Sequence, residues 1–158
     1  MRKRSKYRPR PVLLNPVAHA IKGAQIVGHT PEGTVLMIKT HSAVENIRCG
    51  RGSRADVEKL IDALNMTEAL ASMRFGQEWG NEIRAAQDAL HALGSRGAET
   101  GKFILRGPEL TALNLGIQIH DAQLDVCTIA ELEKAIDKVT RTVMSKQARP
   151  IVLSKEKP

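Results

Sequence analysis

Aromatic residues are scarce in this sequence. Its 158 residues include two phenylalanines, one tryptophan and one tyrosine. A β-sandwich core is usually rich in aromatic and β-branched side chains, whereas alanine, leucine and methionine favour helices. The core must therefore be aliphatic, and the composition predicts a mainly α protein. A chain of this length typically forms one domain and buries enough surface to fold without disulfides or a metal.

Cysteines and long apolar runs are also scarce. The two cysteines, Cys49 and Cys127, lie far apart in the sequence and match no C-x-x-C spacing. We expect both to be reduced thiols, as is usual in the cytoplasm. No apolar run reaches membrane-spanning length, and the prolines between residues 9 and 16 oppose an amphipathic targeting helix. The sequence therefore predicts a cytoplasmic protein that does not contact a membrane.

Acidic residues are absent from the first ten positions. Residues 1–10 carry six basic side chains, which account for most of the formal net charge of +7. Residues 11–144 carry a net charge of −2, from 14 basic and 16 acidic side chains, and residues 145–158 carry +3. The basic character therefore belongs to the two ends. We predict a basic N-terminal arm over residues 1–11, a helical domain over residues 12–145 and a basic C-terminal tail over residues 146–158.

Helix-start signals divide the central region. Ser42, Ser53 and Thr128 are each followed three residues later by an acid, which is the capping-box pattern. Proline follows Asn15 and Gly107, where it suits the first turn of a helix. Apolar residues recur at helical spacing after most of these signals. The pattern predicts a bundle of four to five helices, drawn from residues 16–22, 42–50, 54–73, 76–93, 107–124 and 128–143.

Two segments interrupt the helical pattern. Residues 24–27 and 34–39 are apolar and flank HTPEG, whose proline and glycine suit a turn, so we expect a small β-hairpin near the N-terminus. The glycine-rich stretch from Ser95 is expected to be a surface loop, with Gly94 ending the helix before it. The apolar residues 103–105 that follow are expected to pack against the core or to pair with the hairpin.

Several segments of the sequence resemble those of a known group of proteins. They are YRPRPVLLNPVAHAI, HSAVENIRCG, DALNMTEALA, AAQDALHALG and LNLGIQIHDAQLD, which together cover most of the chain. The sequence resembles small helical proteins carried by prophages of proteobacteria, a group without an assigned activity. The resemblance implies a phage accessory protein and transfers no catalytic residue.

The basic arm is the main candidate site. Its cations cannot pack into a core and suit contacts with the phosphates of a polyanion. Tyr7 could stack on an unpaired base. The alternatives are contact with a protein surface and no specific role. The predicted nucleic-acid-binding residues are Arg2, Lys3, Arg4, Lys6, Tyr7, Arg8 and Arg10.

The stretch GRGSR at residues 50–54 is a second basic spot. It precedes a predicted helix, where free backbone N–H groups favour an anion, so Arg51 and Arg54 are predicted to make a secondary anion contact. The alternative is an ordinary turn between two helices. Neither this stretch nor GSRGAETGK has the spacing of a phosphate-binding loop, and we predict no cofactor.

Histidines and carboxylates occur in pairs on two predicted helices. Asp88 and His91 lie on one, and His120 lies beside Asp121 and near Asp125 on the other. Two such helices can hold a divalent ion in a bundle, but the pattern is not the Glu-x-x-His pair of di-iron proteins. We predict no metal site and expect His120 and Asp121 to form hydrogen bonds between helices or with a partner. A nucleophilic pair of Cys49 and His41 lacks an orienting acid.

These features favour a non-enzymatic phage or bacterial accessory protein whose arm contacts nucleic acid or a ribonucleoprotein. The main alternative is an inhibitor or adaptor that binds a host protein through a helical face, with the arm secondary. A weaker alternative is a small enzyme or a nucleotide-sequestering protein that uses the glycine-rich loop, His120 and Asp121. Homo-oligomer formation is compatible with each of them.

Overall fold

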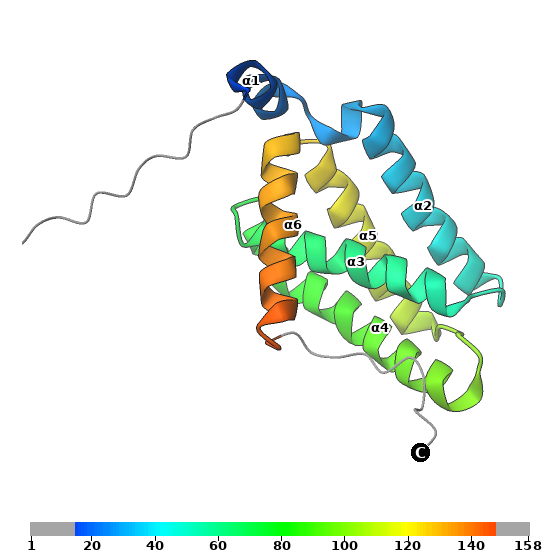
Figure 1. Cartoon of the computed structure of the whole chain (residues 1–158). Helices are drawn as coiled ribbons and strands as arrows, with labels where there is room; N and C mark the ends of the chain where they lie inside the picture. The colour runs from blue at the N-terminus through cyan, green and yellow to red at the C-terminus, as the bar shows by residue number, and fades with distance from the viewer. Residues whose placement is uncertain (1–14, 148–158) are drawn as a thin grey trace, which may run out of the picture.

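The computed structural model describes residues 15–147, which form six α-helices and two short 3-10 turns (Figure 1). No β-strand occurs within that range, and the prediction of a mainly α protein is confirmed. The predicted arm and nearly all of the predicted tail lie outside the described residues. The elements are α1 (Pro16–Ala24), η1 (Val27–His29), α2 (Pro31–Arg48), α3 (Arg54–Ala71), η2 (Gln77–Trp79), α4 (Gly80–Thr100), α5 (Gly107–Leu124) and α6 (Ile129–Met144).

Helix α3 is the centre of the bundle. It packs against α2, α4, α5 and α6, and α5 also packs along α4 and α2. Leu60, Leu64 and Leu70 on α3 are fully buried. Helix α6 crosses α3 steeply instead of running along it (Figure 1). The arrangement therefore leaves part of the α3 surface between α4 and α6 without a covering helix.

Two aliphatic clusters form most of the core. The larger joins α2, α3, α4 and α5, and the smaller joins η1, the end of α3, the end of α5 and α6. Aromatic side chains contribute only at the edges, which agrees with the composition. The largest fully buried hydrophobic residues are Val57, Leu60, Leu64, Leu70, Ile47, Leu90, Leu93, Leu113, Ile117 and Leu124.

Helix α1 lies at one end of the bundle, beside the start of α6 (Figure 1). Asn15 caps it by accepting a hydrogen bond from the Ala18 N–H at 2.9 Å. The segment after α1 is fixed to the turn before α6, because the Val27 N–H donates to the Cys127 carbonyl at 3.0 Å. An isolated antiparallel bridge between Ile26 and Thr128 lies at the same place.

The predicted β-hairpin is wrong. Residues 34–39 belong to α2, which begins at Pro31 with Thr30 as its N-cap. The Thr30 hydroxyl accepts the Gly33 N–H at 3.0 Å, and proline suits the first turn of a helix. A Cβ atom at Gly33 would lie 1.9 Å from the Val27 carbonyl oxygen, so the glycine permits the chain to fold closely against η1. HTPEG is a helix start, and the predicted start at Ser42 lies in mid-helix.

The predicted glycine-rich loop is also wrong. Helix α4 continues through Gly94 and Gly97 to Thr100 and ends at Gly101, whose φ of +72° suits glycine. Gly97 is required because a Cβ atom there would lie 2.1 Å from the Phe103 ring. Phe103 and Leu105 pack against the larger core cluster, as expected, but they form no strand.

The remaining helix starts agree with their signals. Ser53 and Thr128 form complete capping boxes with Asp56 and Glu131. At the start of α5, the Arg106 N–H donates to the Glu109 carboxylate at 2.9 Å. None of the helices between residues 15 and 147 is both long enough and apolar enough to span a bilayer.

Candidate functional site

The predicted nucleic-acid-binding residues Arg2 to Arg10 lie outside the described residues, so their role stays a prediction. Arg51 and Arg54, the predicted secondary anion contact, are exposed; Arg51 lies in the turn between α2 and α3, and Arg54 is the first residue of α3. The Arg51 N–H donates to the Asn46 carbonyl at 2.8 Å. Arg54 forms an ion pair with Glu58, at 2.8 Å from Nε to Oε1.

The start of α3 is already capped by a carboxylate. Asp56 Oδ2 accepts hydrogen bonds from the Ser53 N–H at 3.1 Å and from the Ser53 hydroxyl at 2.7 Å. Burial would raise the pKa of Asp56, but the hydrogen bonds from Ser53, Asn46 and Lys59 outweigh burial and hold this pKa below its usual value. A negative charge therefore occupies the helix start. An anion here would depend on the side chains of Arg51 and Arg54, and this contact stays a prediction.

A buried polar cluster joins α3 and α5. His120 is 1% exposed, and its Nδ1 lies 3.0 Å from the Thr67 hydroxyl oxygen. The Thr67 hydroxyl donates its one hydrogen to the Ala63 carbonyl at 2.8 Å. It must therefore accept from His120, so Nδ1 carries the imidazole proton. Gln123, one turn further along α5, donates to the carbonyls of Thr67 at 3.1 Å and Phe75 at 2.6 Å.

His120 is held in its neutral form. Burial lowers its pKa to about 4; nearby Asp121 opposes this shift and His41 adds to it. Its Nε2 is buried and has no hydrogen-bond partner among the described residues. Protonation would place a charge in the interface between α3 and α5, where no carboxylate contacts the ring directly. The cluster therefore connects the helices instead of transferring protons near neutral pH.

A second contact on α5 reaches α2. Asp121 Oδ2 lies 2.6 Å from Nε2 of His41, and the His41 side chain is 57% exposed. The expectation that His120 and Asp121 form hydrogen bonds between helices is confirmed, because one contacts α3 and the other contacts α2. Consecutive residues of an α-helix point to different sides of the helix, so His120 and Asp121 contact different neighbouring helices.

The histidine and carboxylate pairs are not brought together into a metal centre. Asp88 and His91 line a groove beside α3 and α6, whereas His120 is buried against Thr67 and Asp121 contacts His41. Across residues 15–147, no group of three His, Cys, Asp or Glu side chains is arranged to hold a metal ion.

The two cysteines differ in exposure. Cys127 is buried, and burial raises its pKa to about 11. Cys49 is exposed at the end of α2 and donates a hydrogen bond to the Glu45 carboxylate at 3.0 Å. That hydrogen bond raises the pKa of Cys49 and keeps it a thiol. His41 lies eight positions earlier in the sequence, about 12 Å along the helix axis, so it does not pair with Cys49.

A groove of about 740 Å³ lies on the uncovered surface of α3. Helix α3 forms its floor, and α4 and α6 form its walls. We call this feature the α3/α4/α6 groove. Its apolar lining is Ile61, Leu64, Ala69, Leu90, Val139 and Val143, and its polar lining includes Arg54, Glu58, Asn65, Glu68, Ser72, Arg84, Gln87, Asp88, His91, Lys138, Thr142 and Gln147.

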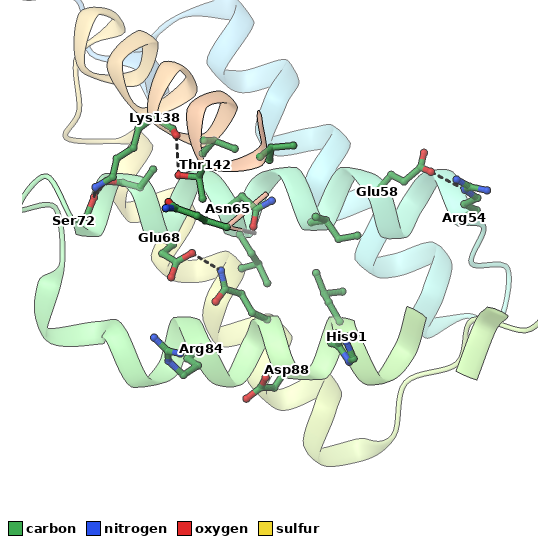
Figure 2. Close-up of a pocket in the computed structure, with 18 residues that line it drawn as sticks. Arg54, Glu58, Asn65, Glu68, Ser72, Arg84, Asp88, His91, Lys138 and Thr142 are labelled. Carbon is green, nitrogen blue, oxygen red and sulfur yellow. Dashed lines mark hydrogen bonds and ion pairs between the residues drawn. The ribbon is translucent and has the colours of Figure 1, made fainter. Parts of the chain in front are cut away.

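Polar side chains from all three helices make up most of the groove lining (Figure 2). Glu68 on α3 accepts a hydrogen bond from the Gln87 amide on α4 at 3.0 Å. Lys138 on α6 contacts the Ser72 hydroxyl at the end of α3. These contacts connect the walls to the floor, and Arg84, Asp88 and His91 lie along α4 in the same view.

The sequence did not predict this groove. Its residues come from three helices, and each contributes an ordinary helical stripe that resembles a solvated face. The sequence signal was the apolar pair Val143 and Met144 at the end of the last predicted helix, which the structure leaves 54% and 78% exposed.

The comparisons with known proteins place the chain in no group. No family model matches it, and no curated protein or solved structure is significantly similar.

Proposed function

We propose that the protein is a non-enzymatic accessory protein of phage or bacterial origin, located in the cytoplasm, that contacts nucleic acid or a ribonucleoprotein through its basic arm. The observation that supports this proposal is the division of charge. Residues 15–147 hold 15 basic and 16 acidic side chains, whereas the flanking residues 1–14 and 148–158 together hold nine basic and one acidic side chain.

The cations of the helical body are partly neutralised by its own acids. Five lysine or arginine side chains form ion pairs with carboxylates between residues 15 and 147. The pair of Arg96 and Glu109 is half-buried and bidentate, with distances of 2.8 and 2.5 Å. The body therefore has no surplus of positive charge, and the excess that suits a polyanion belongs to the ends.

The arm has the composition of a phosphate-binding segment. Six cations that each neutralise a phosphate would give a salt dependence of about −5 in log K against log salt for a duplex, and about −4 for a single strand. Tyr7 lies among these cations and supplies a ring on which an unpaired base can stack. The helical body carries the arm and presents a surface for a protein partner or for a second copy.

The test compares two variants with equal charge changes. In the arm variant the six basic residues of positions 1–10 are replaced by glutamine. In the body variant six exposed cations are replaced instead, namely Lys39, Arg84, Lys102, Arg106, Lys134 and Arg141. Fluorescence anisotropy with a labelled DNA strand, alone and as a duplex, is measured across a salt series. We expect the arm variant to lose the steep salt dependence and the body variant to keep most of it.

Equal losses of DNA affinity in the two variants would contradict the proposal, because binding would then depend on the total charge of the protein and not on the arm. Absence of binding by the wild-type chain at low salt would contradict it as well. Affinity purification from the native host with and without nuclease tests the adaptor alternative. Protein partners that remain after nuclease treatment, and that also bind the arm variant, would favour an inhibitor or adaptor that acts through a helical face.

A further inference from the structure

The C-terminal segment begins at the edge of the α3/α4/α6 groove. Thr142 and Val143 near the end of α6 line the groove, and so does Gln147, the last described residue. Ile151 follows Gln147 by four positions, a separation of at most ~14 Å in an extended chain. The residues that follow α6 therefore need no long connection to reach the groove.

The apolar part of this segment matches the part-exposed apolar side chains of the groove. Residues 151–153 are Ile-Val-Leu, the only run of three apolar residues after α6. The apolar side chains that the groove leaves partly open to solvent are Ile61 on α3 and Val139 and Val143 on α6. An extended tripeptide with branched side chains suits a concave apolar surface, because burial in the groove removes both apolar surfaces from water.

One carboxylate at the groove edge also complements the segment, although the lining carries the cations Arg84 and Lys138 as well. Glu68 has a neutral hydrogen-bond partner in the described region, the side-chain amide of Gln87. The apolar run is flanked by Arg149 and Lys155, so an extended segment in the groove carries a cation on each side. A cation beside Glu68 would add a charge-assisted contact that Gln87 does not supply.

We infer that the α3/α4/α6 groove is the binding site of the chain's own C-terminal segment, with its apolar run Ile-Val-Leu against Ile61, Val139 and Val143 and a flanking cation beside Glu68. Any peptide partner of this groove must then displace the segment. The inference is independent of the proposed function, because it involves the C-terminal segment and the helical body without nucleic acid.

The test uses NMR on the full chain with labelled methyl groups. In the wild type we expect nuclear Overhauser effects between the Ile151 methyls and those of Ile61 or Val143. The double substitution Ile151→Asp and Leu153→Asp should abolish them and shift the groove methyls. The control, Ser154→Asp with Pro158→Asp, adds the same charge outside the apolar run and should leave them in place. Methyls of Leu113 and Ile117 report that the core stays folded.

Two results would overturn the inference. In the first, the wild type shows none of these Overhauser effects, and its groove methyl shifts coincide with those of the aspartate variant. In the second, mixed samples of differently labelled chains show the effects only between copies, so that the groove holds the segment of a second molecule. Retention of the effects in the aspartate variant would also exclude an apolar anchor.

Discussion

Gly116 of α5 packs directly against Ala86 of α4. A Cβ atom at position 116 would lie 2.5 Å from the Ala86 Cβ and 3.0 Å from Cδ2 of Leu64. Ala86 and Leu64 are both fully buried. The close approach of α4 and α5 therefore depends on two small residues that face each other across the interface, and the core there has no space for an added methyl group.

Gly116→Ala is expected to destabilise the protein by about 1–3 kcal/mol, because overpacking outweighs the better helix propensity of alanine. The matched control is Gly80→Ala at the start of α4, where an added Cβ has no neighbour within 4 Å. Urea unfolding measures both changes. The control should stay within about 0.5 kcal/mol of the wild type; equal midpoints for the two variants would show that the interface tolerates the methyl group.

The buried imidazole of His120 predicts an acid-dependent loss of stability. Its pKa is lowered to about 4 in the folded protein, against about 6.5 in the unfolded chain. Above pH 6.5 the titration of His120 therefore leaves the free energy of unfolding at its full value. This free energy decreases as the pH falls, because the unfolded chain binds a proton that the folded protein excludes. The loss should approach about 3 kcal/mol near pH 4.

His120→Asn removes this titration, so its free energy of unfolding should change less between pH 7 and pH 4 than that of the wild type. His19→Asn, on an exposed position of α1, is the control and should follow the wild-type curve. Urea unfolding at each pH gives the comparison. Parallel curves for the wild type and His120→Asn would contradict the buried neutral state.

The bidentate ion pair between Arg96 and Glu109 should stabilise the protein more than an exposed pair. The Arg96 side chain also reaches the Ile104 carbonyl at 3.0 Å, which fixes the link between α4 and α5. A double-mutant cycle with alanine is expected to give a coupling free energy of about 1–2 kcal/mol. The same cycle on the exposed Arg54–Glu58 pair should give about 0.3–0.5 kcal/mol. Equal coupling free energies for the two pairs would show that partial burial does not strengthen the pair of Arg96 and Glu109.

Thiol labelling should separate the two cysteines. Cys49 is expected to react in the native protein and Cys127 only after unfolding, because Cys127 is buried. Glu45→Gln should lower the pKa of Cys49 and increase its labelling rate several-fold near neutral pH, since the carboxylate stabilises the protonated thiol. Glu32→Gln, at the other end of α2, is the control. An unchanged rate in Glu45→Gln would contradict the influence of that carboxylate.

Local signals in the sequence predicted much of the fold. The capping boxes at Ser53 and Thr128 lie where α3 and α6 begin. The hairpin prediction failed because four consecutive apolar residues, 35–38, do not distinguish a strand from a helix. In α2 two of these residues, Val35 and Ile38, are exposed, so the helix lacks a clear apolar stripe. The contacts of Gly33 and Gly97 could not be predicted, because they depend on neighbours that only the folded chain provides.

The candidate sites were predictable to different degrees. The charge of the arm follows directly from composition, and the contacts of His120 and Asp121 between helices follow from their positions on α5. The α3/α4/α6 groove depends on the angle at which α6 crosses α3. The apolar pattern of a single helix does not predict that angle.

The attachment of α1 to α6 sets where the two basic segments of the sequence join the helical body. Lys22 of α1 pairs with Glu133 near the start of α6 at 2.5 Å, whereas Gln147 follows the end of that helix. The 16 residues of α6 span about 24 Å. The described chain therefore enters the bundle beside one end of α6 and leaves it at the other, so the two basic segments of the sequence are attached at opposite ends of that helix.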